Sequence, residues 1–285
     1  TNYRIAKENG AFQMTSEADF VTMAIALGTD GHFGMQNADG SAIFQETDNG
    51  DYATLLSSAY EVTKNVDISY DTTGIISLNR NDKQDVAHAF SGSLSGKNGN
   101  VTITQNISAE QERVGIFSTI TGANTFENLT ISGTVFNAKG TGGLAYQRID
   151  SGSTPASLVL NNITVNKTFD STNLDVIGGV LAVANGVSSR PLEVSGQNIS
   201  LLSNMTGVKT SNTSGFITNM NYAVLDISGN KAQSIPGFVL GGTIDIPEYG
   251  EVGGFLGKEW LNVGGKVTDI SVQSGATYTT NGGFG

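Results

Sequence analysis

The chain of 285 residues contains no cysteine and only 4 prolines. The absence of cysteine excludes disulfide bonds, which most eukaryotic secreted domains carry, although a chain of this size does not need them. Glycine, with 37 residues, is about twice as frequent as in an average protein, and asparagine, serine and threonine are abundant. This composition favours many short strands joined by tight turns, and it fits an exported bacterial protein.

Charged residues are also scarce, at 14 % of the chain against about 25 % in an average domain, and the net charge is −11. Lysine and arginine occur singly, so nucleic acids and anionic membrane surfaces are disfavoured as partners. No apolar stretch approaches the ~18 residues of a membrane span, and we expect no membrane insertion. The first residues do not resemble a signal peptide, so we expect that one was removed or is not included in this sequence.

Histidine is limited to His32 and His88, which excludes a His-Glu-x-x-His zinc site. No Gly-x-Ser-x-Gly nucleophile elbow, phosphate loop or dinucleotide fingerprint occurs. We therefore expect structural or solvent-exposed roles for both histidines, and no cofactor.

The second half of the chain has a recurring motif, a glycine followed by two apolar residues. The copies are Gly115-Ile116-Phe117, Gly143-Leu144-Ala145, Gly179-Val180-Leu181, Gly215-Phe216-Ile217 and Gly254-Phe255-Leu256. They lie 28, 36, 36 and 39 residues apart. Recurrence at about this spacing indicates stacked copies of one small unit.

A polar–apolar–hydroxyl–apolar unit follows most of these glycines. Its copies are Asn128–Ile131, Asn162–Val165, Asn198–Leu201 and Asp269–Val272. Two short strands per repeat do not suit helical repeats, and the ladder of leucine-rich repeats is missing. We predict an all-β fold, a right-handed parallel β-helix with stacked apolar residues inside, glycines at crowded bends and asparagine ladders in the turns.

The N-terminal part contains the one convincing helix, over residues 15–28. Its expected features are the N-cap Ser16, the near capping box with Asp19, an apolar face of Phe20, Ala24 and Leu27, and a stop at Gly28. We predict an N-terminal cap over 1–59, with this helix covering the first turn, and a parallel β-helix over 60–285. A short apolar run at 75–78 belongs to its first strands. Residues 281–285 look like the opening of another copy, so we expect the natural chain to continue.

Five segments in a fixed order carry a family resemblance. They are the helix Ser16–Leu27, Tyr60–Ile68, Phe90–Gly96, Val114–Phe117 and Asn128–Ile131. Their order resembles bacterial surface proteins with GLUG-type repeats, including the non-catalytic N-terminal region of IgA-protease-type metallopeptidases. The resemblance implies a β-helix on an exported surface protein, often with an adhesive role. The chain departs from the family pattern at Ser118, where a glycine usually stands; that glycine survives as Gly257.

A catalytic carboxylate pair is an alternative, because glycosidases and polysaccharide lyases also use β-helices. A hydrolase needs two acids about 5–9.5 Å apart. The candidates are Asp67 with Asp71, Asp82 with Asp85, and the loop residues Asp150, Asp170 and Asp175. They form no recurrent acidic column, and the basic residues that a lyase needs are sparse. A calcium-like stretch at 37–46 has Met35 in place of its first ligand, and like 48–51 it is interpreted as a polar turn.

The only tryptophan, Trp260, stands near Tyr249 in the sequence. Exposed aromatic rings stack on sugars, so these two residues are the candidate ligand site, with packing inside a loop as the alternative. The sequence favours a non-enzymatic adhesin module, secreted or on the bacterial cell surface. Its strand faces and its loops at 145–157 and 168–176 would bind a host glycan, a host surface protein or another copy. The alternatives are a carbohydrate-active enzyme and a passive spacer of a larger exported enzyme.

Several Asn-x-Ser/Thr triplets could accept N-linked glycans, at Asn106, Asn128, Asn162, Asn198 and Asn204. Because these asparagines stand just before strand residues, we interpret them as turn residues of the repeat.

Overall fold

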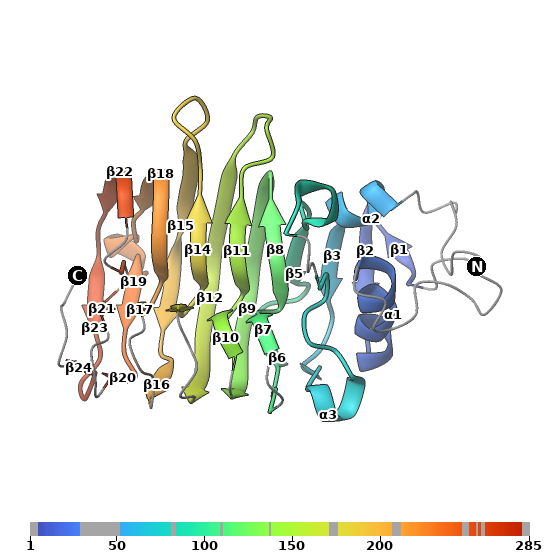
Figure 1. Ribbon diagram of the computed structural model, residues 1–285, viewed down its shortest axis with the longest axis horizontal. Coiled ribbons are helices and arrows are strands. Elements are labelled where there is room, and N and C mark those ends of the chain that lie inside the picture. Colours follow the sequence, from blue (N-terminus) through green and yellow to red (C-terminus); the bar gives the residue numbers. More distant parts are fainter. Residues whose placement is uncertain are drawn as a thin grey trace.

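The structure is a computed structural model that describes residues 5–28, 52–80, 84–108, 111–136, 138–170, 176–206, 212–246, 251–254, 256–257 and 260–280. Strands make up 58 % and helices 12 % of the described residues, which confirms the all-β class. The strands form a parallel β-solenoid of about 5 turns, as the repeat predicts. Its turns follow one another along the long axis of the molecule (Figure 1).

One 19-stranded sheet forms three faces of the solenoid. The first face stacks β3 (Ala59–Val62), β5 (Ser93–Gly96), the starts of β9 (Ala123–Phe136), β12 (Ser157–Asp170) and β15 (Leu192–Leu201), and the ends of β18 (Ile217–Ile227) and β22 (Trp260–Val267). The second face stacks β4 (Val66–Asp67), β6 (Val101–Thr104), the ends of β9, β12 and β15, then β16 (Asn204–Thr206), β19 (Phe238–Leu240), β20 (Thr243–Ile246), β23 (Ile270–Val272) and β24 (Thr277–Thr280). The third face stacks β8 (Phe117–Thr121), β11 (Ala145–Ile149), β14 (Leu181–Asn185) and the start of β18.

A separate five-stranded parallel sheet links the second and third faces. It consists of β7 (Gln111–Val114), β10 (Ala138–Gly142), β13 (Val176–Gly178), β17 (Asn212–Ser214) and β21 (Glu251–Gly253). Inward residues alternate along each strand, so in β12 Leu158, Leu160, Ile163 and Val165 are all fully buried. Each stacks on its equivalents in the neighbouring turns, which produces the narrow apolar core that the sequence predicts.

The repeated glycines stack directly on one another. The amide of Gly143 donates to the carbonyl of Gly179 at 3.0 Å, and that of Gly215 donates to Gly254 at 3.1 Å. A Cβ atom at Gly179 would lie 1.8 Å from the carbonyl oxygen of Gly215. The repeat therefore requires glycine because two backbones meet where a side chain would stand.

The asparagine ladder is also confirmed. Asn128, Asn162 and Asn198 have φ values of 55, 52 and 55°, and they turn the chain from the first face to the second. The side-chain amide of Asn162 donates to Asn128 Oδ1 at 3.0 Å, and that of Asn198 donates to Asn162 Oδ1 at 3.3 Å. Asparagine tolerates this left-handed conformation better than most residues. In two further triplets, Asn106 and Asn204 accept hydrogen bonds from backbone amides of the next turn.

The helix predicted over 15–28 is α1 (Glu17–Leu27), and the Asp19 carboxylate accepts the Ser16 amide at 3.1 Å as in a capping box. Its predicted apolar face is buried. Gly28 ends the helix in an extended conformation with φ −71°, without the left-handed turn typical of a glycine stop.

The N-terminal end contains further elements that the sequence did not predict. α2 (Tyr52–Ser57) packs beside α1, and the Tyr52 hydroxyl donates to the carbonyl of Leu27 at 2.9 Å. β1 (Lys7–Glu8) pairs antiparallel with β2 (Ala11–Met14), which itself pairs in parallel with β3. The stack therefore begins inside the segment assigned to the cap, and these elements lie together at one end of the molecule (Figure 1).

The apolar run at 75–78 is buried but forms no strand, unlike our expectation. It follows the short helix α3 (Tyr70–Thr73) and is held by side chains, because Asn79 Nδ2 donates to the carbonyl of Thr119 at 2.7 Å. Ser118 donates through its amide to Asn79 Oδ1 at 3.0 Å and through its hydroxyl to the Asn79 carbonyl at 2.9 Å. Ser118 thus fastens this segment to the first complete turn. The described residues also form two 3-10 helices, η1 (Val86–His88) and η2 (Lys231–Gln233).

We expect the substitution Gly179→Ala to destabilise the protein by about 1–3 kcal/mol, because the added methyl group overpacks two backbones. Gly264→Ala in β22 is the control, since a Cβ there meets nothing within 4 Å; its effect should stay within roughly 0.5 kcal/mol. Denaturant unfolding followed by circular dichroism measures both. Equal stability of the two variants would contradict the stacking argument.

Asn162 allows the amide ladder and the left-handed turn to be separated. Asn162→Gly removes the amide but keeps the conformation, whereas Asn162→Ala also strains the backbone. We expect both variants to be less stable than the natural sequence, with the alanine variant lower by about 1 kcal/mol. The melting temperatures should fall in the order Asn, Gly, Ala, and the reverse order for Gly and Ala would show that the backbone conformation contributes nothing.

Candidate functional site

The side chains of the predicted aromatic pair lie outside the part of the chain that the structure describes. Tyr249 lies outside the described residues. Trp260 begins β22, where its backbone pairs with Met220 of β18, and its side chain is outside the description. The pair therefore remains a prediction.

Two of the predicted carboxylates, Asp67 and Asp85, contact neighbouring groups. Asp67 accepts the amide of Ser69 at 2.9 Å, while Asp85 lies 2.5 Å from the ring nitrogen of His88. Asp71 and Asp170 are exposed at the surface. Among the described residues, no group of three or more His, Asp or Glu side chains could hold a metal ion. The remaining candidates lie outside the described residues: His32, the stretches 37–46 and 48–51, Asp82 and Asp175.

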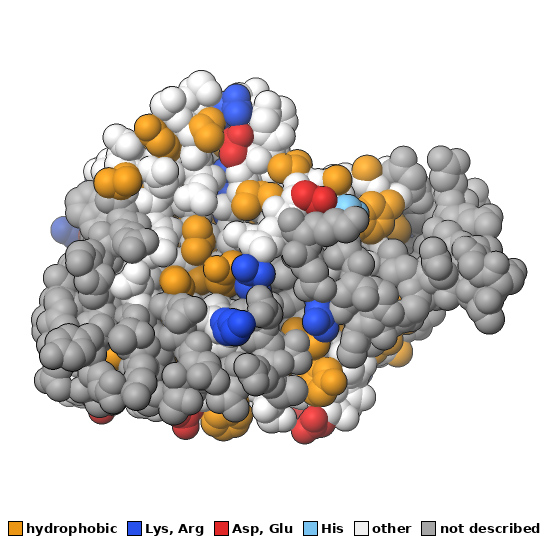
Figure 2. Space-filling view, viewed as in Figure 1, with side chains coloured by type: hydrophobic (Ala, Val, Ile, Leu, Met, Phe, Trp, Pro, Cys, Tyr) orange, Lys and Arg blue, Asp and Glu red, His pale blue; other side chains and the backbone are white. Residues whose placement is uncertain are grey.

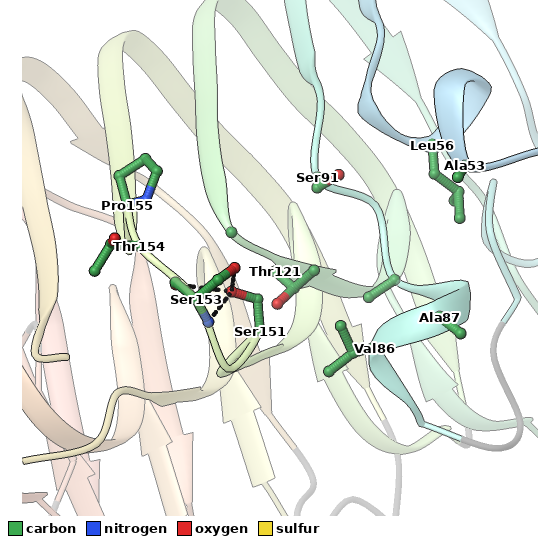
Figure 3. A pocket seen from close by; sticks show the side chains of 12 residues that line it. Ala53, Leu56, Val86, Ala87, Ser91, Thr121, Ser151, Ser153, Thr154 and Pro155 are labelled. Atoms are coloured by element: carbon green, nitrogen blue, oxygen red, sulfur yellow. Dashed lines mark hydrogen bonds between the residues drawn. The ribbon is translucent and has the colours of Figure 1, made fainter. Parts of the chain in front are cut away.

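A groove of about 340 Å³ lies where the cap meets the solenoid. Its lining residues are Ala53, Leu56, Val86, Ala87, Ala89, Ser91, Thr121, Gly122, Ser151, Ser153, Thr154 and Pro155. The loop between β11 and β12 forms one wall, and α2 with η1 forms the other (Figure 3). None of these residues is charged, so the groove combines aliphatic surface with hydroxyl groups.

An ion pair anchors the loop wall. Arg190, which follows β14, donates to both oxygens of the Asp150 carboxylate, at 2.7 and 3.3 Å. The amide of Gly152 donates to the same carboxylate at 3.0 Å, and the Ser151 hydroxyl donates to the Ser153 carbonyl at 3.0 Å. The hydrogen bond from Arg190, followed by that from Gly152, holds the pKa of Asp150 below its usual range. The serines are therefore presented on a loop that is already ordered.

Arg148 lies beside the floor of the groove and is completely buried. It donates to the carbonyl of Asn185 at 2.7 Å and to that of Gly122, a groove residue, at 3.1 Å, while its Nε has no partner. Burial lowers the pKa of Arg148 to about 10. These two hydrogen bonds connect the floor of the groove to the third face.

The cap wall is built around Tyr52, whose ring lies 5.9 Å from that of His88. Burial, and then the Asp85 carboxylate, raise the pKa of Tyr52. His88 has the structural role expected from the sequence, because it holds η1 between Asp85 and α2.

A second unusual group, Lys167 of β12, lies inside the solenoid and is 0 % exposed. Its amine donates to Gln105 Oε1 and, at 3.2 Å, to the carbonyl of Gly143. Burial lowers the pKa of Lys167 to about 7, so much of the amine is neutral at physiological pH. The sequence pattern does not predict that Lys167 is buried, because a single lysine among apolar residues is usually interpreted as a side chain that points to solvent.

The groove suits an uncharged ligand with both apolar and hydrogen-bonding groups. The loop at 145–157 was predicted to carry recognition, and its Ser151, Ser153, Thr154 and Pro155 line the groove. The loop at 168–176 lies largely outside the described residues. The cap wall was missed because α2 has only 6 residues, too few for a periodic signal. On the face drawn in Figure 2, the charged side chains that the structure describes are few and scattered. No helix in the described segments is long and apolar enough to cross a bilayer.

We expect the melting temperature of the Asp150→Asn variant to depend less on pH in the acid range than that of the natural chain. The folded pKa of Asp150 is depressed, so its stabilisation is complete above the unfolded pKa of about 3.9 and is lost as pH falls through the folded pKa. The natural chain should therefore lose more melting temperature between pH 6 and pH 3 than the variant. Arg190→Ala should behave like Asp150→Asn. A natural-chain loss no larger than that of the variants would show that the ion pair does not anchor the loop.

Comparison of the chain with protein-family models, with curated proteins and with solved structures found no match. The geometry of the groove and of the outer faces is therefore the basis for the function of this chain.

Proposed function

We propose that this chain is a non-enzymatic adhesive module, secreted or displayed on a bacterial cell surface, that binds an uncharged segment of a host glycan or host surface protein. The observation that carries the proposal is the groove between the β11–β12 loop and the cap. Its walls are held by hydrogen bonds and ring contacts before any ligand arrives, which lowers the entropic cost of binding.

The position of the groove supports a role in adhesion. The loops that follow β11 and β14 extend beyond the ends of the strands on the same side of the solenoid (Figure 1). Loops on a stiff scaffold commonly carry recognition, because the scaffold fixes their position while their sequence can vary. The resemblance to GLUG-repeat surface proteins agrees with this assignment.

The second face offers a flat surface of the kind that contacts large partners. Its outward hydroxyl residues stack in register as Thr102, Thr130, Thr164 and Ser200. None of them is charged, whereas the first face carries Glu61, Glu127, Glu193 and Lys266. The groove lies at the corner between the third and first faces, so the second face would be a separate contact surface.

A catalytic role has less support. Asp85 and Asp150 are each committed to a neighbouring basic side chain. The groove itself contains hydroxyl groups without a histidine, carboxylate or lysine to activate them. We therefore assign ligand binding, and not turnover, to the groove.

The test uses Ser153→Trp, which fills the groove from its exposed loop. Binding of the purified protein to a glycan array and to immobilised host-cell glycoproteins should fall about tenfold or more, which corresponds to about 1.4 kcal/mol. Ser189→Trp, in the neighbouring loop between β14 and β15, is the matched control and should bind like the natural chain.

Equal binding of both variants would refute the groove as the site. Absence of binding by the natural chain to every ligand would favour the passive spacer. Release of reducing sugar from a polysaccharide panel, lost in Asp67→Asn, would favour the carbohydrate-active enzyme.

A further inference from the structure

The buried amine of Lys167 needs an explanation that the groove does not provide. A charged lysine in an apolar interior is costly unless a carboxylate pairs with it. The partners of this amine are the Gln105 side-chain amide and a backbone carbonyl. Lys167 and Gln105 are both 0 % exposed.

Register explains how the two residues meet. Lys167 pairs with Gly133 of the preceding turn, and the amide of Gln105, one turn earlier again, bonds to Ser132 beside that glycine. Gln105, Gly133 and Lys167 thus occupy one inward column over three turns. Because Gly133 has no side chain, the lysine can extend past it and reach an amide two strand spacings, roughly 9–10 Å, away.

The amide is held firmly in this position. Gln105 Nε2 donates to the carbonyls of Ile76 and Gly115, at 2.7 and 2.9 Å, which turns its carbonyl group toward Lys167. The carbonyl carbon lies only about 1.23 Å beyond the oxygen that the amine contacts. A small side-chain rotation brings the nitrogen within about 3–3.5 Å of that carbon, the separation of a near-attack arrangement.

We propose that Lys167 and Gln105 form an intramolecular isopeptide crosslink inside the solenoid. The lone pair of the neutral Lys167 amine attacks Cδ of Gln105, and a new Nζ–Cδ bond forms. A proton passes from Nζ to Nε2, the Cδ–Nε2 bond breaks, and Nε2 leaves as ammonia. No oxidant, reductant or cofactor is needed, since one amide is exchanged for another.

Two effects favour this exchange inside the protein. Burial keeps much of the amine unprotonated, as in other desolvated nucleophilic lysines. Fixed positions also replace a bimolecular encounter, which raises the effective concentration of the two reacting groups. The product would join two non-adjacent turns of a chain that has no cysteine for a disulfide.

The deciding experiment is the intact mass of the purified, denatured chain. We expect it to lie below the sequence mass by one ammonia molecule, and we expect proteolysis to yield a branched peptide that joins Gln105 to Lys167. Lys167→Met and Gln105→Met should each have the full sequence mass. Lys139→Met, at an exposed lysine of β10, is the matched control and should keep the deficit.

Cyclisation at an Asn-Gly pair also releases ammonia, so a deficit that persists in Lys167→Met overturns the proposal. A natural chain with the full sequence mass and no branched peptide overturns it as well.

Stability against pH is a second readout. A free Lys167 has a folded pKa of about 7 against 10.5 when unfolded, so unfolding would take up a proton and stability would rise with pH across that window. The crosslinked chain should lack a rise that depends on Lys167, and the presence of that rise would contradict the crosslink. These outcomes are independent of ligand binding at the groove.

Discussion

Parallel stacking of strands about 4.8 Å apart is the constraint on which the rest of this structure depends. Each residue lies directly over its counterpart in the next turn, so the residues of one column share the same packing and backbone conformation. Gly143, Gly179 and Gly215 share a place where backbones touch. Asn128, Asn162 and Asn198 share a left-handed corner and bond to one another. The sequence repeats because each turn places the equivalent position in the same environment.

The ends of a stack cannot be satisfied in this way, because the first turn has no predecessor. Here α1, α2 and the segment at 75–79 take the place of the missing turn. Those elements do not follow the spacing of the strands, and a groove remains where they meet the β11–β12 loop (Figure 3). The candidate binding site therefore forms where the irregular cap meets the regular solenoid.

Polar groups inside the solenoid are also satisfied by partners stacked in neighbouring turns. Asn79 and Ser118 satisfy each other's backbone and side-chain groups across neighbouring turns. Gln105 and Lys167 do so across two turns, with Gly133 leaving the space between them. A buried polar group without partners would cost roughly 1–3 kcal/mol, so such pairs also fix the register of the turns that they join.

The sequence by itself determined the all-β class, the stacked turns, the helix at 17–27 and the roles of the repeated glycines and asparagines. These features are encoded locally or periodically, and a period survives without knowledge of distant contacts. Only the tertiary structure decided that the run at 75–78 is not a strand, that Leu56 and Val86 face Ser153, and that Lys167 points inward to Gln105. Each of these depends on residues 29 to 97 positions apart in the sequence, whose approach is set by how the turns stack.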